Sequence, residues 1–176
     1  MPICKQWFSP CMVNLLSLDT KGRNEWFQNY DLDHTEDKWK NHLIHNINEV
    51  VPGFKYLVDF QWEFENNVGD LIFGSDYGIY LVIESSWLNM NTGPRAERSR
   101  IEAGINVKDR ARRFKQLAIA KYGNDAIKII GASYTNDTEN GNIQFVDNQD
   151  KKIASIVKDA YNNEGKEYYQ LSLFTN

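Results

Sequence analysis

The spacing of hydrophobic and polar residues in the first half of the chain predicts one helix followed by three strands. Apolar and aromatic residues recur every three or four positions over residues 35–50, and Pro52-Gly53 ends this run, which predicts a helix. Residues 58–64 then alternate with the period of two that is typical of a half-buried strand. Short apolar runs follow at residues 71–73 and 79–83, and the turn at residues 74–78 predicts that they form a β-hairpin.

The second half of the chain predicts two further helices and two further strands. Apolar positions of residues 105–122 fall on one stripe, which indicates an amphipathic helix that ends at Gly123. Residues 126–134 are apolar nearly throughout and predict a central strand, residues 143–146 predict an edge strand, and residues 151–161 predict a last helix. We therefore expect an α/β fold, with a mixed sheet of about four to five strands flanked by helices, in the order helix-strand-strand-strand-helix-strand.

The length of 176 residues, of which 41% are hydrophobic, indicates a single domain. We expect its core at about residues 35–135, with an N-terminal arm of residues 1–34 and a C-terminal helix and tail of residues 150–176 packed on it. No long apolar run and no signal-peptide pattern is present, so we expect an intracellular protein, cytoplasmic or nuclear, with no membrane partner. Cys4 and Cys11 lack the spacing of a zinc cluster, and we interpret them as free thiols.

Two carboxylates mark the ends of the predicted hairpin strands. Asp70 precedes the first strand and Glu84 follows the second, and the start of one hairpin strand lies beside the end of the other. The pair is therefore expected to bind a divalent cation, Mg²⁺ or Mn²⁺, with the carbonyl oxygen of Ser85 as a third hard ligand. The alternative is that both residues are merely solvated acids at strand ends.

Positive charge is concentrated directly downstream of these acids, although the net charge of the chain is −4. Residues 95–121 hold nine lysine or arginine residues against three acids. Such a segment beside a cation site suits a polyanion, and we expect nucleic acid, DNA or RNA, to contact Lys108, Arg112, Arg113, Arg95 and Arg98. The alternative is the solvated face of an ordinary amphipathic helix.

Aromatic and histidine side chains offer two further hypotheses. Trp87, Tyr77 and Tyr80 have the chemistry to stack on unpaired bases, although core packing is the alternative for each. His42, His45 and Glu49 share one face of the first predicted helix, a spacing that also suits a transition metal such as zinc.

The order of elements and the position of the two acids resemble the core of the PD-(D/E)XK phosphodiesterase superfamily, the restriction-endonuclease-like fold. The matching segments are Gly69-Asp70-Leu71-Ile72-Phe73 and Tyr80-Leu81-Val82-Ile83-Glu84-Ser85-Ser86, and the resemblance spans about residues 35–135. It implies that Asp70 and Glu84 are catalytic metal ligands and that the first helix supplies an accessory acid, for which Glu49 is the candidate. It also places Arg110 where the family often has a glutamine on the next helix.

The chain departs from the family pattern at Ser86, which stands where the motif has a lysine. In the family that lysine is thought to position the attacking water and to stabilise charge on the phosphorus, which a neutral hydroxyl cannot do. Arg110 and Lys115 are the candidate replacements, and Lys115 is the better base of the two.

The expected function is therefore metal-dependent hydrolysis of nucleic-acid phosphodiester bonds, by a monomer or a homodimer. The first alternative is a non-catalytic module of the same fold that binds nucleic acid or protein. A second is a protein-interaction module that uses the aromatic-rich N-terminal arm.

Overall fold

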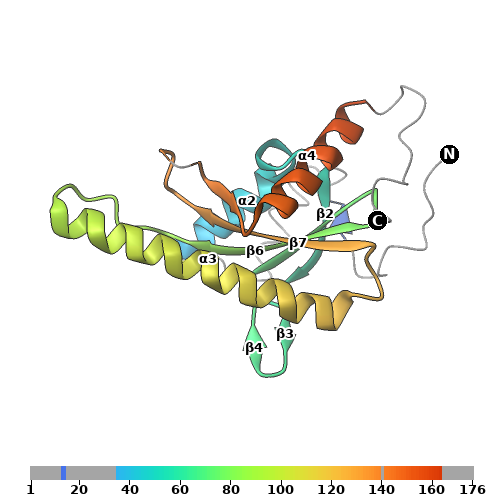
Figure 1. The fold of residues 1–176 in the computed structure, drawn as a ribbon, viewed down its shortest axis with the longest axis horizontal. Helices are drawn as coiled ribbons and strands as arrows, with labels where there is room; N and C mark the ends of the chain where they lie inside the picture. Colours follow the sequence, from blue (N-terminus) through green and yellow to red (C-terminus); the bar gives the residue numbers. More distant parts are fainter. Residues whose placement is uncertain (1–12, 15–34, 140, 164–176) are drawn as a thin grey trace.

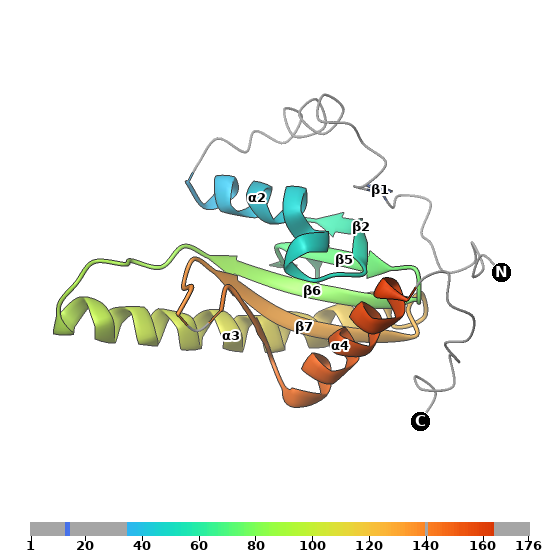
Figure 2. The same ribbon diagram turned by 90° about the horizontal axis from the view of Figure 1, so that it is seen from above.

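Within the residues that the computed structural model describes, 13–14, 35–139 and 141–163, six strands form one mixed sheet and three helices pack against it (Figures 1 and 2). The strands lie in the order β1 (Val13–Asn14), β2 (Phe54–Phe60), β5 (Leu71–Ser75), β6 (Ile79–Ser86), β7 (Lys128–Thr135) and β8 (Ile143–Phe145). The helices are α2 (Thr35–Val50), α3 (Pro94–Tyr122) and α4 (Asn148–Asn162). Neighbouring strands are antiparallel except β6 and β7, which are parallel. The expected α/β architecture is confirmed.

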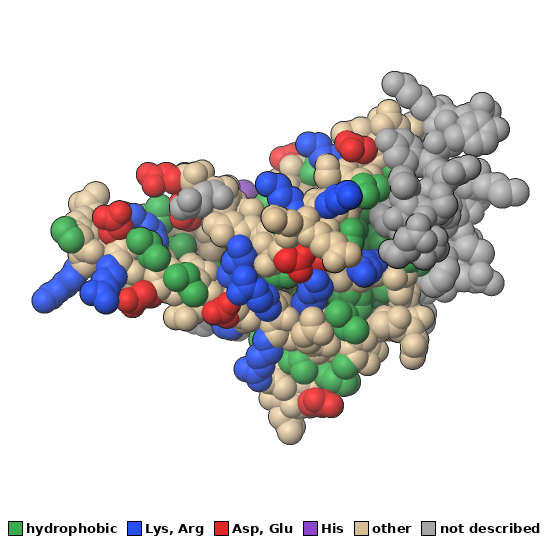
Figure 3. Space-filling model, in the orientation of Figure 1, with side chains coloured by type: hydrophobic (Ala, Val, Ile, Leu, Met, Phe, Trp, Pro, Cys, Tyr) green, Lys and Arg blue, Asp and Glu red, His purple; other side chains and the backbone are tan. Residues whose placement is uncertain are grey.

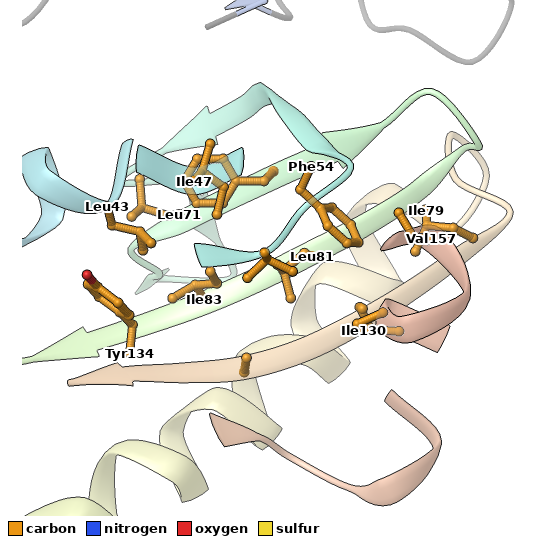
Figure 4. Packing of buried hydrophobic residues seen from close by; sticks show 14 of the residues in the cluster. Leu43, Ile47, Phe54, Leu71, Ile79, Leu81, Ile83, Ile130, Tyr134 and Val157 are labelled. Carbon is orange, nitrogen blue, oxygen red and sulfur yellow. The ribbon is translucent and has the colours of Figure 1, made fainter. Parts of the chain in front are cut away.

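The two faces of the sheet carry two separate hydrophobic clusters. Helices α2 and α4 cover one face, where Leu43, Ile47 and Val157 pack on strand residues such as Leu81 and Ile130 (Figure 4). Helix α3 covers the other face, where its buried residues meet the opposite side of the same strands. Because successive strand residues point to opposite faces, each central strand contributes to both clusters, which explains why these strands are apolar nearly throughout.

Helix α2 has the bounds that its sequence pattern predicts, and β8 lies within its predicted range. The predicted strand at residues 58–64 is displaced toward the N-terminus, because β2 begins at Phe54 and ends at Phe60, and Gln61 adopts a positive φ of 46°. The chain then forms a separate small hairpin of β3 (Glu63–Phe64) and β4 (Asn67–Val68), which projects from the sheet (Figure 1). A buried Trp62 anchors this hairpin, and Gly69 leaves room for it, because a Cβ atom at Gly69 would lie 2.4 Å from the indole ring.

Helix α3 begins at Pro94, eleven residues before its predicted start. Its buried residues, Val107, Ala111, Phe114 and Ala118, lie between the middle of the helix and its C-terminal end. The N-terminal half extends beyond the strands (Figures 1 and 2). The hydrophobic pattern therefore predicted only the part of the helix that packs on the sheet.

Several expectations concern residues outside the described part of the chain. The predicted N-terminal arm is described only at β1, and Cys4, Cys11 and residues 164–176 lie outside the description. Among the helices that are described, none has the length and apolar character needed to cross a bilayer.

Candidate functional site

Asp70 and Glu84 lie side by side at one end of the β5–β6 hairpin. The register pairs Leu71 with Ile83, so the two acids directly beyond this pair are neighbours. The backbone N–H of Asp70 donates to Glu84 Oε1 at 3.0 Å. Both side chains are removed from solvent, with exposed fractions of 8% for Asp70 and 0% for Glu84. The hairpin thus builds a buried pair of carboxylates.

Ser85 holds the Asp70 carboxylate in place. Its backbone N–H and its hydroxyl both donate to Asp70 Oδ2, at 2.8 Å and 3.0 Å. These contacts involve the N–H and the hydroxyl, so the role of the Ser85 carbonyl oxygen as a metal ligand stays a prediction.

Two cations reach the acid pair from opposite faces of the sheet. Lys40, on α2, places its Nζ 2.8 Å from Asp70 Oδ1, and Arg110, on α3, donates to Glu84 Oε2 at 2.8 Å. The structure therefore brings Arg110 to the acids as the sequence suggests. Lys40 was not among the residues that the sequence singled out, because no motif connects a lone helical lysine with an acid thirty residues downstream.

Burial controls the protonation of Glu84. The pKa of its carboxyl is raised to about 7, because desolvation and the neighbouring Asp70 carboxylate outweigh the Asp70 N–H, Arg110 and Lys40, which act in the opposite direction. A carboxyl with this pKa exchanges a proton near neutral pH, which is a property of acid–base and metal-binding sites.

Glu49, the predicted accessory acid, lies away from the pair. It follows Lys40 by nine helical residues, which is about two and a half turns, so the two side chains leave α2 on opposite sides. Glu49 is accordingly exposed. This placement corrects the expectation that Glu49 joins the site.

Lys115, a predicted catalytic base, is also engaged elsewhere. Its ammonium group donates to both carboxylate oxygens of Asp150, at 2.7 Å and 2.8 Å, and lies 3.4 Å from Asp147. The lysine thus connects α3 with the start of α4, and the acid pair receives its ammonium group from Lys40 instead.

Much of the positive charge of α3 is neutralised within the molecule. Among the nine bases of residues 95–121, five form ion pairs with acids: Arg98 with Glu102, Arg110 with Glu84, Arg112 with Asp109, Lys115 with Asp150, and Lys121 with Asp59. Arg113 instead bonds the side chain of Asn67. Figure 3 shows the corresponding mixture, with blue and red side chains interspersed along the helix.

A groove of about 900 Å³ runs between the N-terminal half of α3 and the segment that contains β7, β8 and the start of α4. Its lining includes the bases Arg100, Lys108 and Lys151 and the acids Glu97, Asp137, Glu139 and Asp147. Ser133 also lines it and pairs with Glu84 in the β6–β7 ladder, so the groove approaches the acid pair. Its mixed charge differs from the continuous positive surface that binds duplex nucleic acid.

The three aromatic candidates for base stacking differ in accessibility. Tyr80 is only 1% exposed and Tyr77 packs against the hydrophobic core, which excludes Tyr80 and disfavours Tyr77 as a stacking surface. Trp87 is 49% exposed.

Within the described residues, no group of three acid, histidine or cysteine side chains comes together, so His42, His45 and Glu49 do not form the transition-metal site considered above.

The donor set at the acid pair fits Mg²⁺ or Mn²⁺ better than zinc. Asp70 and Glu84 supply hard carboxylate oxygens without nitrogen or sulfur ligands, and Mg²⁺ is commonly held by one or two carboxylates, with water and substrate phosphate completing its octahedron. Lys40 and Arg110 each contact one of these oxygens, so a cation would compete with both of them.

Comparisons with protein-family models, with curated proteins and with solved structures found no match to this chain.

Proposed function

We propose that the Asp70–Glu84 pair is the centre of a metal-dependent phosphodiesterase that acts on nucleic acid. The observation that carries this proposal is the buried pair of carboxylates with a lysine and an arginine in contact with it from opposite faces of the sheet. Mg²⁺ or Mn²⁺ held by these acids would supply Lewis-acid charge neutralisation and a hydroxide nucleophile at neutral pH.

Lys40 supplies the positive group that is missing at Ser86. Its ammonium group is 2.8 Å from Asp70 Oδ1, which is hydrogen-bond distance. An ammonium or guanidinium group at this position stabilises negative charge that develops on a phosphate. Arg110 is half exposed while its guanidinium contacts Glu84, so it is placed to contact both the acid and a bound phosphate.

Glu84 must be ionised to hold a cation. In the metal-free protein its pKa is about 7, and a bound divalent cation would favour the carboxylate form. Asp70 is oriented by the two hydrogen bonds that Ser85 donates to it.

A specific observation favours a second candidate, a non-catalytic binding module. All four carboxylate oxygens of the pair have a protein donor, namely Lys40 and Ser85 at Asp70, and Arg110 and the Asp70 N–H at Glu84. A closed network of this kind also serves as a structural ion cluster. In the phosphodiesterase the two acids bind the catalytic metal, whereas in the binding module they only stabilise the fold.

Cleavage assays with Asp70→Asn separate these candidates. Asparagine removes the charge but keeps an oxygen that accepts from Ser85, so the hairpin end should keep its geometry. We expect the unmodified protein to cleave single- or double-stranded DNA or RNA in the presence of Mn²⁺, and Asp70→Asn to lose at least about 100-fold of that rate.

The matched control is Asp76→Asn. Asp76 also pairs with a lysine, Lys55, but lies in the turn at the opposite end of the same hairpin. The control should cleave at the normal rate. Activity that both variants retain, or absence of cleavage of all four substrates by the unmodified protein, would reject the phosphodiesterase and leave the binding module.

A further inference from the structure

An aromatic cluster of Trp39, His42, Trp87 and Tyr134 adjoins the acid pair. Trp39 precedes Lys40 on α2, Trp87 follows Glu84 by three residues, and Tyr134 belongs to β7 beside the end of β6. The cluster therefore lies at the same end of the sheet as Asp70 and Glu84.

Tyr134 and His42 occupy one face of Trp39. The Tyr134 ring stacks on the indole with centroids 4.6 Å apart, and the His42 ring stacks with centroids 5.3 Å apart, both nearly parallel to it. His42 Nδ1 and the Tyr134 hydroxyl share a hydrogen bond of 3.1 Å. Rings on opposite faces of an indole are separated by two stacking distances, about 7 Å, so this bond requires both rings on the same face.

Trp87 completes the cluster and presents an aromatic surface to solvent. It meets Trp39 at an interplanar angle of 81°, with centroids 5.4 Å apart. In such an edge-to-face contact Trp39 covers at most one face of Trp87. The exposed fraction of 49% is therefore consistent with an open indole face beside the acid pair.

The backbone on both sides of Trp87 is fixed. Ser86 pairs with Thr135 in the β6–β7 ladder. Leu88 is buried, and the Asn136 side chain accepts from its N–H at 2.6 Å and donates to its C=O at 3.0 Å. The backbone position of Trp87 is thus set before any ligand arrives, which reduces the entropy lost on binding.

We propose that Trp87 is a stacking platform for an unpaired nucleobase, so that the protein binds single-stranded nucleic acid with one base on Trp87 and the backbone passing the Asp70–Glu84 pair. The choice of ligand rests on the proposed function. A base in the interior of a duplex is stacked on both sides and cannot use such a platform, whereas an unpaired base can.

Binding to two matched strands tests this proposal. Fluorescein-labelled oligothymidylate of roughly ten nucleotides is compared with an abasic strand of equal length and charge, in EDTA so that neither is cleaved. We expect the unmodified protein to prefer the strand with bases. Trp87→Ala should weaken that binding by between about 5- and 150-fold and leave the abasic strand unaffected.

Two variants complete the design. Trp87→Phe keeps a smaller ring and should give an intermediate loss, while Ile119→Ala, which trims another exposed apolar side chain, should change neither affinity. The proposal is overturned if Trp87→Ala binds oligothymidylate normally, if it loses both strands equally, or if the unmodified protein does not prefer the strand with bases. Because these measurements need no cleavage, base-dependent binding by a protein that fails the Mn²⁺ assay would reject the phosphodiesterase and keep the platform.

Discussion

Four charged side chains meet at one end of the β5–β6 hairpin, and each is held by a different part of the fold. Asp70 directly precedes β5, Glu84 belongs to β6, Lys40 to α2 and Arg110 to α3. The formal charges of the four groups cancel when all are ionised. Removal of any one of these side chains leaves an uncompensated charge at a buried site, which is costly.

Lys40 should matter for catalysis if the site is a phosphodiesterase. We expect Lys40→Met to lower the cleavage rate by about 100-fold, because it removes the ammonium group next to Asp70, and Lys40→Arg to recover part of the rate. Lys55→Met is the matched control, since Lys55 pairs with Asp76 at the far end of the hairpin. Equal rates for the Lys40 and Lys55 variants in single-turnover assays would contradict this role.

Glu84 should make stability depend on pH. Its pKa rises from 4.5 to about 7 on folding because of burial, so between these pH values the folded state holds more protons than the unfolded state. Raising the pH through this window therefore lowers the free energy of unfolding, by on the order of 2 kcal/mol from this group.

Urea denaturation of the unmodified protein and of Glu84→Gln, at pH values from 4.5 to 7, measures this effect. The difference in unfolding free energy between the two proteins isolates Glu84, because the other acids contribute to both. We expect the advantage of the unmodified protein to shrink as the pH rises. A difference that stays constant or grows would contradict the raised pKa.

Sequence alone identified the acid pair but not its full surroundings. Asp70 and Glu84 were found because strand patterns are local and a hairpin fixes which residues face each other. Lys40 was missed because its contact depends on how α2 crosses the end of the sheet, which no spacing encodes. Glu49 was chosen for its residue type, and helical geometry places it on the wrong side of α2.

At the scale of elements, α3 combines a packed half with an unsupported half. The helix is 29 residues long, which corresponds to about 43 Å, and its buried residues begin only at Val107. Sequence patterns predicted the packed half because apolar residues recur there. Residues 94–106 show no such stripe, so only the start signals Gly93 and Pro94 indicate a helix.

Gly104 should weaken the unsupported half. It lies in the interior of α3, and a Cβ atom there would meet nothing within 4 Å. Gly104→Ala should therefore stabilise this half by about 0.5–1 kcal/mol and slow amide hydrogen exchange around it by about two- to fivefold. Unchanged amide hydrogen exchange at residues 98–106 would contradict the prediction that Gly104 weakens this half of the helix.

Gly131→Ala provides the contrast for that experiment. A Cβ atom at Gly131 would lie 3.1 Å from Lys115 Cβ and 3.3 Å from Val146 Cγ1, in a packed part of the sheet. The glycine-to-alanine substitution should therefore destabilise the protein at Gly131, whereas it should stabilise α3 at Gly104.

At the scale of the whole molecule, Asp150 connects three elements. The carboxylate is 1% exposed and accepts from Lys115 on α3 and from the backbone N–H of Gly131 on β7, while Asp150 itself belongs to α4. The Lys115–Asp150 ion pair thus joins α3 and α4, which cover opposite faces of the sheet. The Gly131 N–H joins the same carboxylate to β7.

Removing Asp150 should destabilise the fold more than removing a surface acid. We expect Asp150→Ala to lower the free energy of unfolding by about 3–5 kcal/mol, because Lys115 and the Gly131 N–H both lose a buried partner. Asp109→Ala breaks the exposed pair with Arg112 and should cost less than about 0.5 kcal/mol. Similar urea midpoints for the two variants would contradict this assignment.

The separation of the four site residues along the chain has a consequence for folding kinetics. The acids meet when a hairpin closes over 14 residues, whereas Arg110 comes from 26 residues away and Lys40 from thirty. Shorter loops close faster and lose less chain entropy, so we expect the carboxylates to meet before their counter-ions arrive. At neutral pH this early step brings like charges together, and a pH near or below 4.5, the pKa of a solvated Glu84, should relieve the repulsion and speed hairpin closure.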